Sequence, residues 1–120
     1  MSLLDPTPLD GAWQLHEYVV GGQPSPIDGL LLFAGRRWST VFFVPAGAGW
    51  WGSAEAGEYA FDGASLTFTH RYTFQGGGGR PLVLNPANDR IEPCGVTLSD
   101  AALTITFPSG NHLHCRRVTS

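Results

Sequence analysis

The chain has 120 residues, of which 42% are hydrophobic and 14% charged, and its formal net charge is −3. This length suits one domain. An acidic chain with only 7 basic residues lacks the positive surface that nucleic acid or an anionic membrane would require, so neither partner is expected. The first residues carry no basic, apolar signal sequence, and no segment reaches the roughly 18 apolar residues of a membrane span. We therefore expect a cytoplasmic protein.

Many glycines and prolines with few charges predict short strands joined by tight turns. The first predicted strand, residues 11–20, alternates with period two and places Trp13, Leu15, Glu17 and Val19 on one face. The next two predicted strands are residues 28–33 and 37–44.

The second half of the chain continues this pattern. Residues 45–57 are predicted as the longest loop, and residues 58–74 as a hairpin that turns at Asp62-Gly63. One face of its second arm carries Leu66, Phe68, His70, Tyr72 and Phe74. The glycine run 76–79 is predicted as a flexible loop. The last strands are expected at residues 82–84, 90–98, 102–107 and 112–118, with Pro93 marking an edge or a bulge.

These elements predict an all-β fold without helices. About eight antiparallel strands with mostly short connections favour a single up-and-down antiparallel β-barrel, in which closure leaves no exposed sheet edge. Residues 1–9 are expected to form an N-terminal tail, and residues 10–120 the barrel domain. A sandwich of two sheets is the alternative.

The stretch GAWQL, residues 11–15, resembles the Gly-x-Trp signature of the lipocalins and the wider calycin group. The segments LLLFAGRRWST and AGEYAFDGASLTFTH are similar to the later strands of bacterial lipocalin-like domains, so the resemblance covers residues 9–118. It implies a lipocalin-like barrel. The chain is shorter than a secreted lipocalin and lacks the C-terminal helix and the evident disulfide of that group, so its ligands are not carried over.

The resemblance also assigns structural roles. Gly11 lets the chain turn sharply at the closed end of the barrel, and Trp13 fills that end with a large apolar area. In the resembling family an Arg of the last strand lies across this Trp. Parity makes Arg117 the inward candidate, and Arg116 the alternative if a bulge changes the parity.

An apolar interior with few polar groups is typical of a small-molecule site. By alternation the predicted lining is Leu15, Val19, Phe42, Tyr59, Phe61, Phe68, Tyr72, Leu103 and Ile105, with Glu17 and His70 as polar points. We therefore predict that a small apolar or amphipathic ligand binds inside the barrel, without a cofactor or metal. The candidate ligand-binding residues are Glu17, Phe42, Tyr59, Phe68, His70, Tyr72, Trp50 and Trp51.

Two other functions remain open. An isomerase, cyclase or hydrolase could use Glu17, His70 and Tyr72 in the cavity, although no nucleophile or oxyanion donor stands out. A structural or interaction domain with a filled barrel is the other alternative. Trp50 and Trp51 are interpreted as a lid over the barrel mouth or as the contact of a homodimer.

The cysteines and the outer histidines suggest no further chemistry. Cys94 and Cys115 are expected to be reduced, buried and inert. His112, His114 and His16 could meet on the outside of the barrel and hold Zn²⁺. Without an acidic partner, an exposed histidine pair is the favoured interpretation.

Overall fold

The structure is a computed structural model that describes residues 6–46 and 49–119. Nine strands make up its regular structure, and the described residues contain no helix. The strands are β1 (Gly11–Val20), β2 (Gln23–Ser25), β3 (Asp28–Ala34), β4 (Arg37–Ala46), β5 (Gly49–Phe61), β6 (Ser65–Gly77), β7 (Arg80–Leu98), β8 (Ala102–Thr106) and β9 (His112–Arg117). Within these described ranges, no helix is long and apolar enough to cross a membrane.

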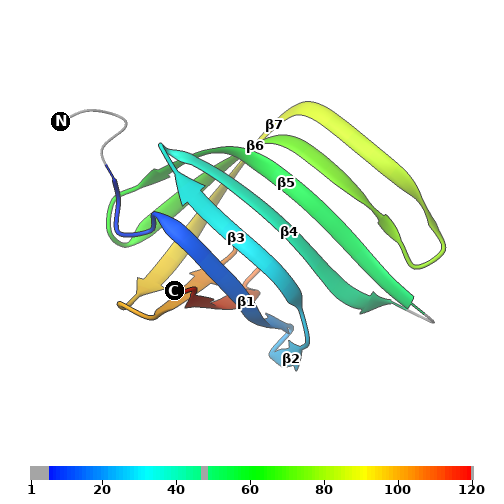
Figure 1. Cartoon of the computed structure of the whole chain (residues 1–120), viewed down its shortest axis with the longest axis horizontal. Coiled ribbons are helices and arrows are strands. Elements are labelled where there is room, and N and C mark those ends of the chain that lie inside the picture. Colours follow the sequence, from blue (N-terminus) through cyan, green and yellow to red (C-terminus); the bar gives the residue numbers. More distant parts are fainter. Residues whose placement is uncertain (1–5, 47–48, 120) are drawn as a thin grey trace.

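Eight of the strands form a closed antiparallel ring. Their order is β1-β3-β4-β5-β6-β7-β8-β9, and a pairing between β1 and β9 closes the barrel (Figure 1). β2 pairs only with residues 18–20 of β1, beside the ring. The predicted all-β, up-and-down barrel is confirmed.

The predicted loop at residues 45–57 is wrong, because β5 begins at Gly49 and pairs along its length with β4 and β6. Its Gly, Ala and Ser residues have low intrinsic strand propensity, so only the two neighbouring strands impose the extended conformation. Similarly, β7 joins the predicted short strands into one of 19 residues. β7 tolerates Pro93 because β8 pairs with it only from Gly95 onward.

The closed end of the barrel is held by Trp13 and Arg117. Trp13 is 0% exposed, its Nε1 donates a hydrogen bond to the Leu9 carbonyl (2.8 Å), and Arg117 Cζ lies 4.1 Å from the ring centre. Arg117 also donates to the carbonyls of Pro8 (2.8 Å) and Asp10 (3.0 Å). Residues 7–9 are therefore held against the barrel, and Leu9 is fully buried.

Gly11 begins β1 at this end with φ +123°, a conformation that L side chains rarely adopt. The Gly-x-Trp spacing therefore lets the chain turn before Trp13 enters the interior.

Register shifts occur in the β1–β9, β5–β6 and β6–β7 pairings, and those in β1 and β6 reverse the side-chain alternation near the barrel interior. In β1, Leu15 pairs with Cys115 and Glu17 with His114, so His16 is an extra residue. In β6, His70 pairs with Gly57 and Tyr72 with Ala56, so Arg71 is extra. An inserted residue shifts all later side chains to the opposite face.

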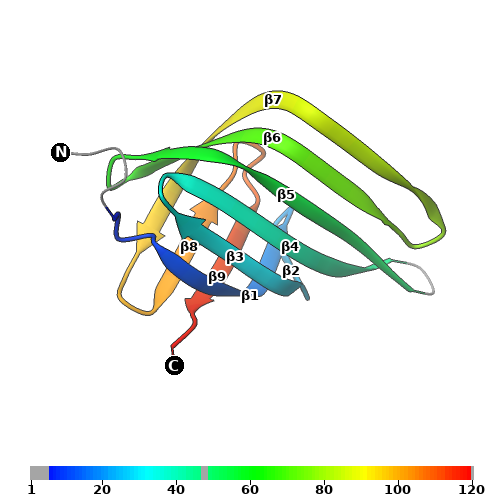
Figure 2. The ribbon, with the colours of Figure 1, turned by 45° about the horizontal axis from the view of Figure 1, so that its top comes forward.

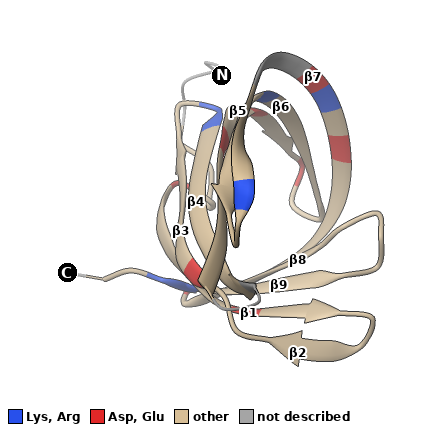
Figure 3. Cartoon of the chain, turned by 90° about the vertical axis from the view of Figure 1, so that its right-hand side faces the viewer, with Lys and Arg blue, Asp and Glu red and all other residues tan. Residues whose placement is uncertain are grey.

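β4 to β7 continue beyond the barrel as a flat extension. Residues 44–46 of β4 lie beyond the last pairing with β3, and residues 80–86 of β7 pair with β6 alone. We call residues 44–46, 49–53, 73–77 and 80–86 the wing; it projects to the right in Figure 2. Charged residues are few on β3 to β6 (Figure 3).

Candidate functional site

A cavity of about 610 Å³ occupies the barrel interior away from Trp13. Its lining includes the exposed residues Pro26, Pro45 and Ser109, so the cavity opens to solvent at the end opposite the Trp13 core. Most of the wall is apolar and comes from seven strands and the adjoining turns: Leu15, Val20, Ile27, Leu31, Trp38, Phe42, Val44, Trp51, Phe68, Ile105, Phe107 and Leu113.

Four of the candidate ligand-binding residues line this cavity. They are Phe42, Trp51, Phe68 and His70. Trp51 and Phe42 lie near the open end with ring centres 6.0 Å apart, and Phe68 packs against Trp38 deeper in the barrel.

The other four candidates do not line it. Glu17 and Tyr72 follow the two bulges, which turn both side chains away from the interior; Tyr72 is 59% exposed. Tyr59 is inside the barrel but belongs to the closed-end core, where its hydroxyl bonds to Thr7 (2.8 Å) and Asp10 (2.9 Å).

Trp50 and Trp51 are adjacent in β5 and therefore point to opposite faces of the sheet. Trp50 is exposed on the outer face. The lid interpretation is wrong for the pair, since the residues belong to a strand rather than to a loop.

The polar centre of the cavity is His70, which is 3% exposed. Its Nδ1 lies 3.2 Å from Glu55 Oε1 and its Nε2 lies 3.0 Å from Glu92 Oε1, both within hydrogen-bond distance. The three strands β5, β6 and β7 supply one residue each. Trp38 completes the surroundings, with its ring centre 5.0 Å from that of His70.

The two carboxylates favour the protonated imidazole, because carboxylate oxygens only accept hydrogen bonds and one faces each ring nitrogen. Arg90 opposes this, since its Nη2, which only donates, lies 3.4 Å from His70 Nδ1. Burial lowers the pKa of His70, but the hydrogen bonds from its ring to Glu55 and Glu92 outweigh burial and raise the pKa above its ordinary value. The same bond to His70 lowers the pKa of Glu92, against the effect of burial.

Arg90 supplies a second cation to this cluster. Its Nη1 donates to Glu92 Oε2 (3.3 Å), and its Nη2 lies 3.9 Å from Glu55 Oε1. Two carboxylates therefore face the His70 ring and one guanidinium, so the charges of the cluster cancel when His70 is protonated. We call Glu55, His70, Arg90 and Glu92 the polar cluster.

Sequence reasoning missed Glu55 and Glu92. Glu55 lies in the segment interpreted as a loop, although alternation continued backward from Tyr59 would have placed it inside. Glu92 stands two residues before Cys94, which the sequence already predicted to be buried, so alternation places both on the same face. Tyr18, which lines the cavity, was hidden by the β1 bulge, since no sequence signal announces that bulge.

The proposed catalytic set of Glu17, His70 and Tyr72 is not assembled. Only His70 lies in the cavity. Both of its ring nitrogens are engaged by carboxylates, so it presents no free nitrogen as a base.

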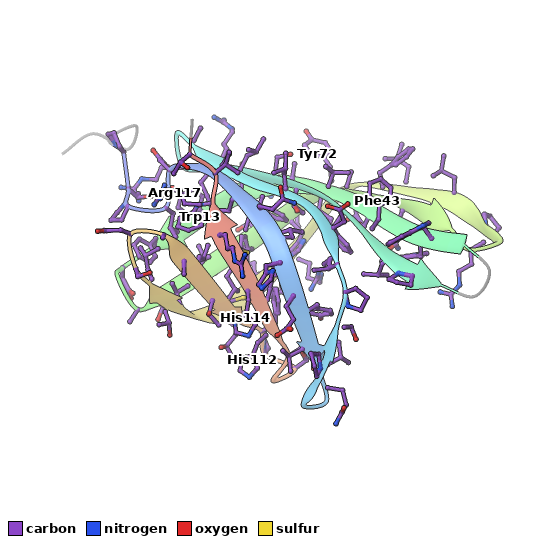
Figure 4. All side chains as sticks on the ribbon, turned by 60° about the horizontal axis from the view of Figure 1, so that its bottom comes forward. Trp13, Phe43, Tyr72, His112, His114 and Arg117 are labelled. Atoms are coloured by element: carbon purple, nitrogen blue, oxygen red, sulfur yellow. The ribbon has the colours of Figure 1, made fainter. Side chains whose placement is uncertain are left out.

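The histidines outside the barrel are satisfied by neighbours. His112 and His114 bond through Nδ1 to Thr106 (3.0 Å) and Thr104 (2.9 Å), and they project from β9 in Figure 4. His16 accepts a hydrogen bond from Arg116 (2.9 Å). In the part of the chain that the structure describes, no group of three or more His, Cys, Asp or Glu side chains could hold a metal ion.

Both cysteines are free and buried. Burial raises the pKa of Cys94 and of Cys115 to about 12. Neither thiol is therefore activated as a nucleophile.

No model of a protein family, no curated protein and no solved structure matches this chain.

Proposed function

We propose that this protein is a lipocalin-like barrel that binds a small molecule with an apolar body and one uncharged polar group. The observation that carries the proposal is a cavity of about 610 Å³ with apolar walls and the polar cluster around His70. Cavities of roughly 300–1,000 Å³ with few polar groups are typical of small-molecule sites. The open volume supports this function over a filled barrel.

The apolar body is expected to lie between the open end and His70. Phe42 and Trp51 form the wall at the entrance, and Leu31 and Ile105 line the deeper part. These side chains offer no charge or strong donor to a ligand. Contact with them favours an aliphatic or aromatic body over a polar one.

The balance of charge in the polar cluster selects an uncharged head group. Glu55 and Glu92 are compensated by the His70 imidazolium and Arg90. A carboxylate or ammonium on the ligand would add an uncompensated charge at a partly desolvated position, which is unfavourable. A hydroxyl or amide adds no charge, and it can donate to a carboxylate or accept from Arg90.

The test compares decanol, decanoate and decylamine, which share one chain and differ only in the head group. Binding is measured at neutral pH by titration calorimetry and by tryptophan fluorescence, since Trp38 and Trp51 line the cavity. We expect decanol to bind most tightly and to shift the emission.

Variants locate the binding. His70→Ala is expected to weaken decanol binding by about 1–3 kcal/mol, the range for disrupting a buried polar network. His114→Ala, on the outside of the barrel, is the matched control and should leave binding unchanged. Absence of binding by all three probes, or equal effects of the two variants, would contradict the proposal.

A further inference from the structure

The outer face of β3 to β7 is apolar where an antiparallel barrel usually presents polar residues to water. Tyr72 and Phe43 project from it in Figure 4. Besides Ile91 of β7, nine large apolar side chains with exposed fractions of 37% to 64% lie on this face: Leu30, Leu32, Val41, Phe43, Trp50, Tyr72, Phe74, Leu82 and Leu84. We call them the outer apolar face.

Strand register makes this face continuous. One cross-strand row runs over five strands, because each residue pairs with the next: Leu30, Val41, Ala54, Phe74 and Leu84. Paired residues of an antiparallel ladder point to the same side of the sheet.

Next to this row, Phe43 and Leu82 lie close to the backbone of the sheet because each packs over a glycine. The Phe43 ring lies over Gly52, where a Cβ would be 2.8 Å from it. Leu82 lies over Gly76 in the same way, at 3.0 Å. These two side chains therefore lie against the backbone and cover it with apolar surface.

The β6 bulge creates this arrangement. The extra residue Arg71 turns Tyr72 and Phe74 outward and Thr73 inward, where Thr73 is buried. Without the bulge the two aromatic side chains would lie on the inner face of the sheet. The bulge therefore adds two aromatic residues to the outer apolar face.

The wing carries much of this face without a second layer over it. Phe74, Leu82, Leu84 and Trp50 belong to wing segments, and the described residues place no other strand over them. Burial of an apolar face removes it from water and stabilises the sheet that carries it. The described residues of the single chain supply no such cover over the wing.

We propose that a second copy of this chain docks on the outer apolar face and forms a face-to-face homodimer. With about 150–250 Å² for each fully exposed large side chain, the nine residues present on the order of 900 Å². A stable interface needs about 800 Å² from each partner. The exposed area is therefore sufficient for a dimer.

Composition and relief favour a second copy over a different partner. The nine residues of the face are aromatic or aliphatic, as in the apolar interfaces of homodimers. The barrel end of the same face has a depression of about 570 Å³, whose lining includes Leu32 and Tyr72 and the charged residues Arg37, Glu58 and Arg71. In a two-fold dimer with antiparallel strands, the Trp50 end of one copy would lie over the depression of the other.

Sedimentation velocity and native mass spectrometry test the proposal on the full chain between about 1 and 100 µM, the range over which a micromolar dimer forms. We expect a species of twice 12.9 kDa at high concentration. Phe74→Glu and Leu84→Glu each place like charges in both copies at the interface. Each is expected to raise the dimer dissociation constant at least about 100-fold, a typical effect of a central interface residue.

Val118→Glu is the matched control, since Val118 is also exposed but lies beyond β9, outside the face. Circular dichroism and the urea midpoint check that each variant is folded. Leu84, which is more exposed than Phe74, provides the second variant if Phe74→Glu fails to fold. A chain that stays monomeric at every concentration overturns the proposal. A dimer that both face variants leave intact also overturns it, as does one that Val118→Glu disrupts equally.

Discussion

Replacing Trp13 by Ala tests the closed end of the barrel. The side chain is 0% exposed and packs within a core that includes Leu9 and Phe33. Truncating a buried Trp to Ala removes its transfer free energy and leaves a cavity, and typically destabilises by about 3–5 kcal/mol. We expect this loss in the free energy of unfolding.

A second substitution separates packing from hydrogen bonding. Trp13→Phe keeps most of the apolar area but removes Nε1, which donates to the Leu9 carbonyl at 2.8 Å. It leaves that buried acceptor without its partner, at a cost of about 1–3 kcal/mol. It also replaces the indole under Arg117 by a smaller ring. We therefore expect Trp13→Phe to be destabilised by less than Trp13→Ala, though measurably.

The assay is urea unfolding followed by circular dichroism at one fixed protein concentration, so that oligomerisation does not change the comparison. Ile91→Ala is the control, because Ile91 is 66% exposed and its truncation should change stability by no more than about 0.5 kcal/mol. A loss below about 1 kcal/mol for Trp13→Ala would refute the argument that this residue closes the barrel.

Three further predictions concern the polar cluster, the thiols and the β5–β6 pairing. Because the folded pKa of His70 lies above its ordinary value of 6.5, its hydrogen bonds should stabilise the fold fully below pH 6.5 and lose this effect as the pH rises through the raised pKa. In urea unfolding from pH 6 to pH 9, the free energy of unfolding should decline in the wild type but not in His70→Gln. Parallel profiles of the two proteins would contradict this. Cys94 and Cys115 should react with a thiol reagent only after unfolding, because burial raises both pKa values to about 12; fast labelling of native protein would count against this. Gly57→Ala should destabilise the protein by about 1–3 kcal/mol, because the new Cβ would overlap a backbone carbonyl oxygen of β6. Gly95→Ala is the control and should be tolerated, because the nearest atom to its Cβ would be 3.8 Å away. Equal urea midpoints of the two variants would refute the steric argument.

The outline of the barrel could be predicted from the sequence, because alternation with period two depends on local residues alone. Trp13 and Leu15 lie inside as their parity predicts, and so do Phe68 and His70. Arg117 also meets Trp13 as parity predicts, since no further bulge in β9 intervenes.

The composition of the polar cluster was decided by tertiary structure. Glu55 belongs to a strand of low intrinsic propensity, which is extended because β4 and β6 flank it. Glu17 and Tyr72 were misplaced because one extra residue in each strand reverses parity. Sequence therefore determined which residues alternate, but the pairing of neighbouring strands decided where the alternation shifts. A bulge is a mismatch in length between two paired strands, and that mismatch exists only once both strands are in place.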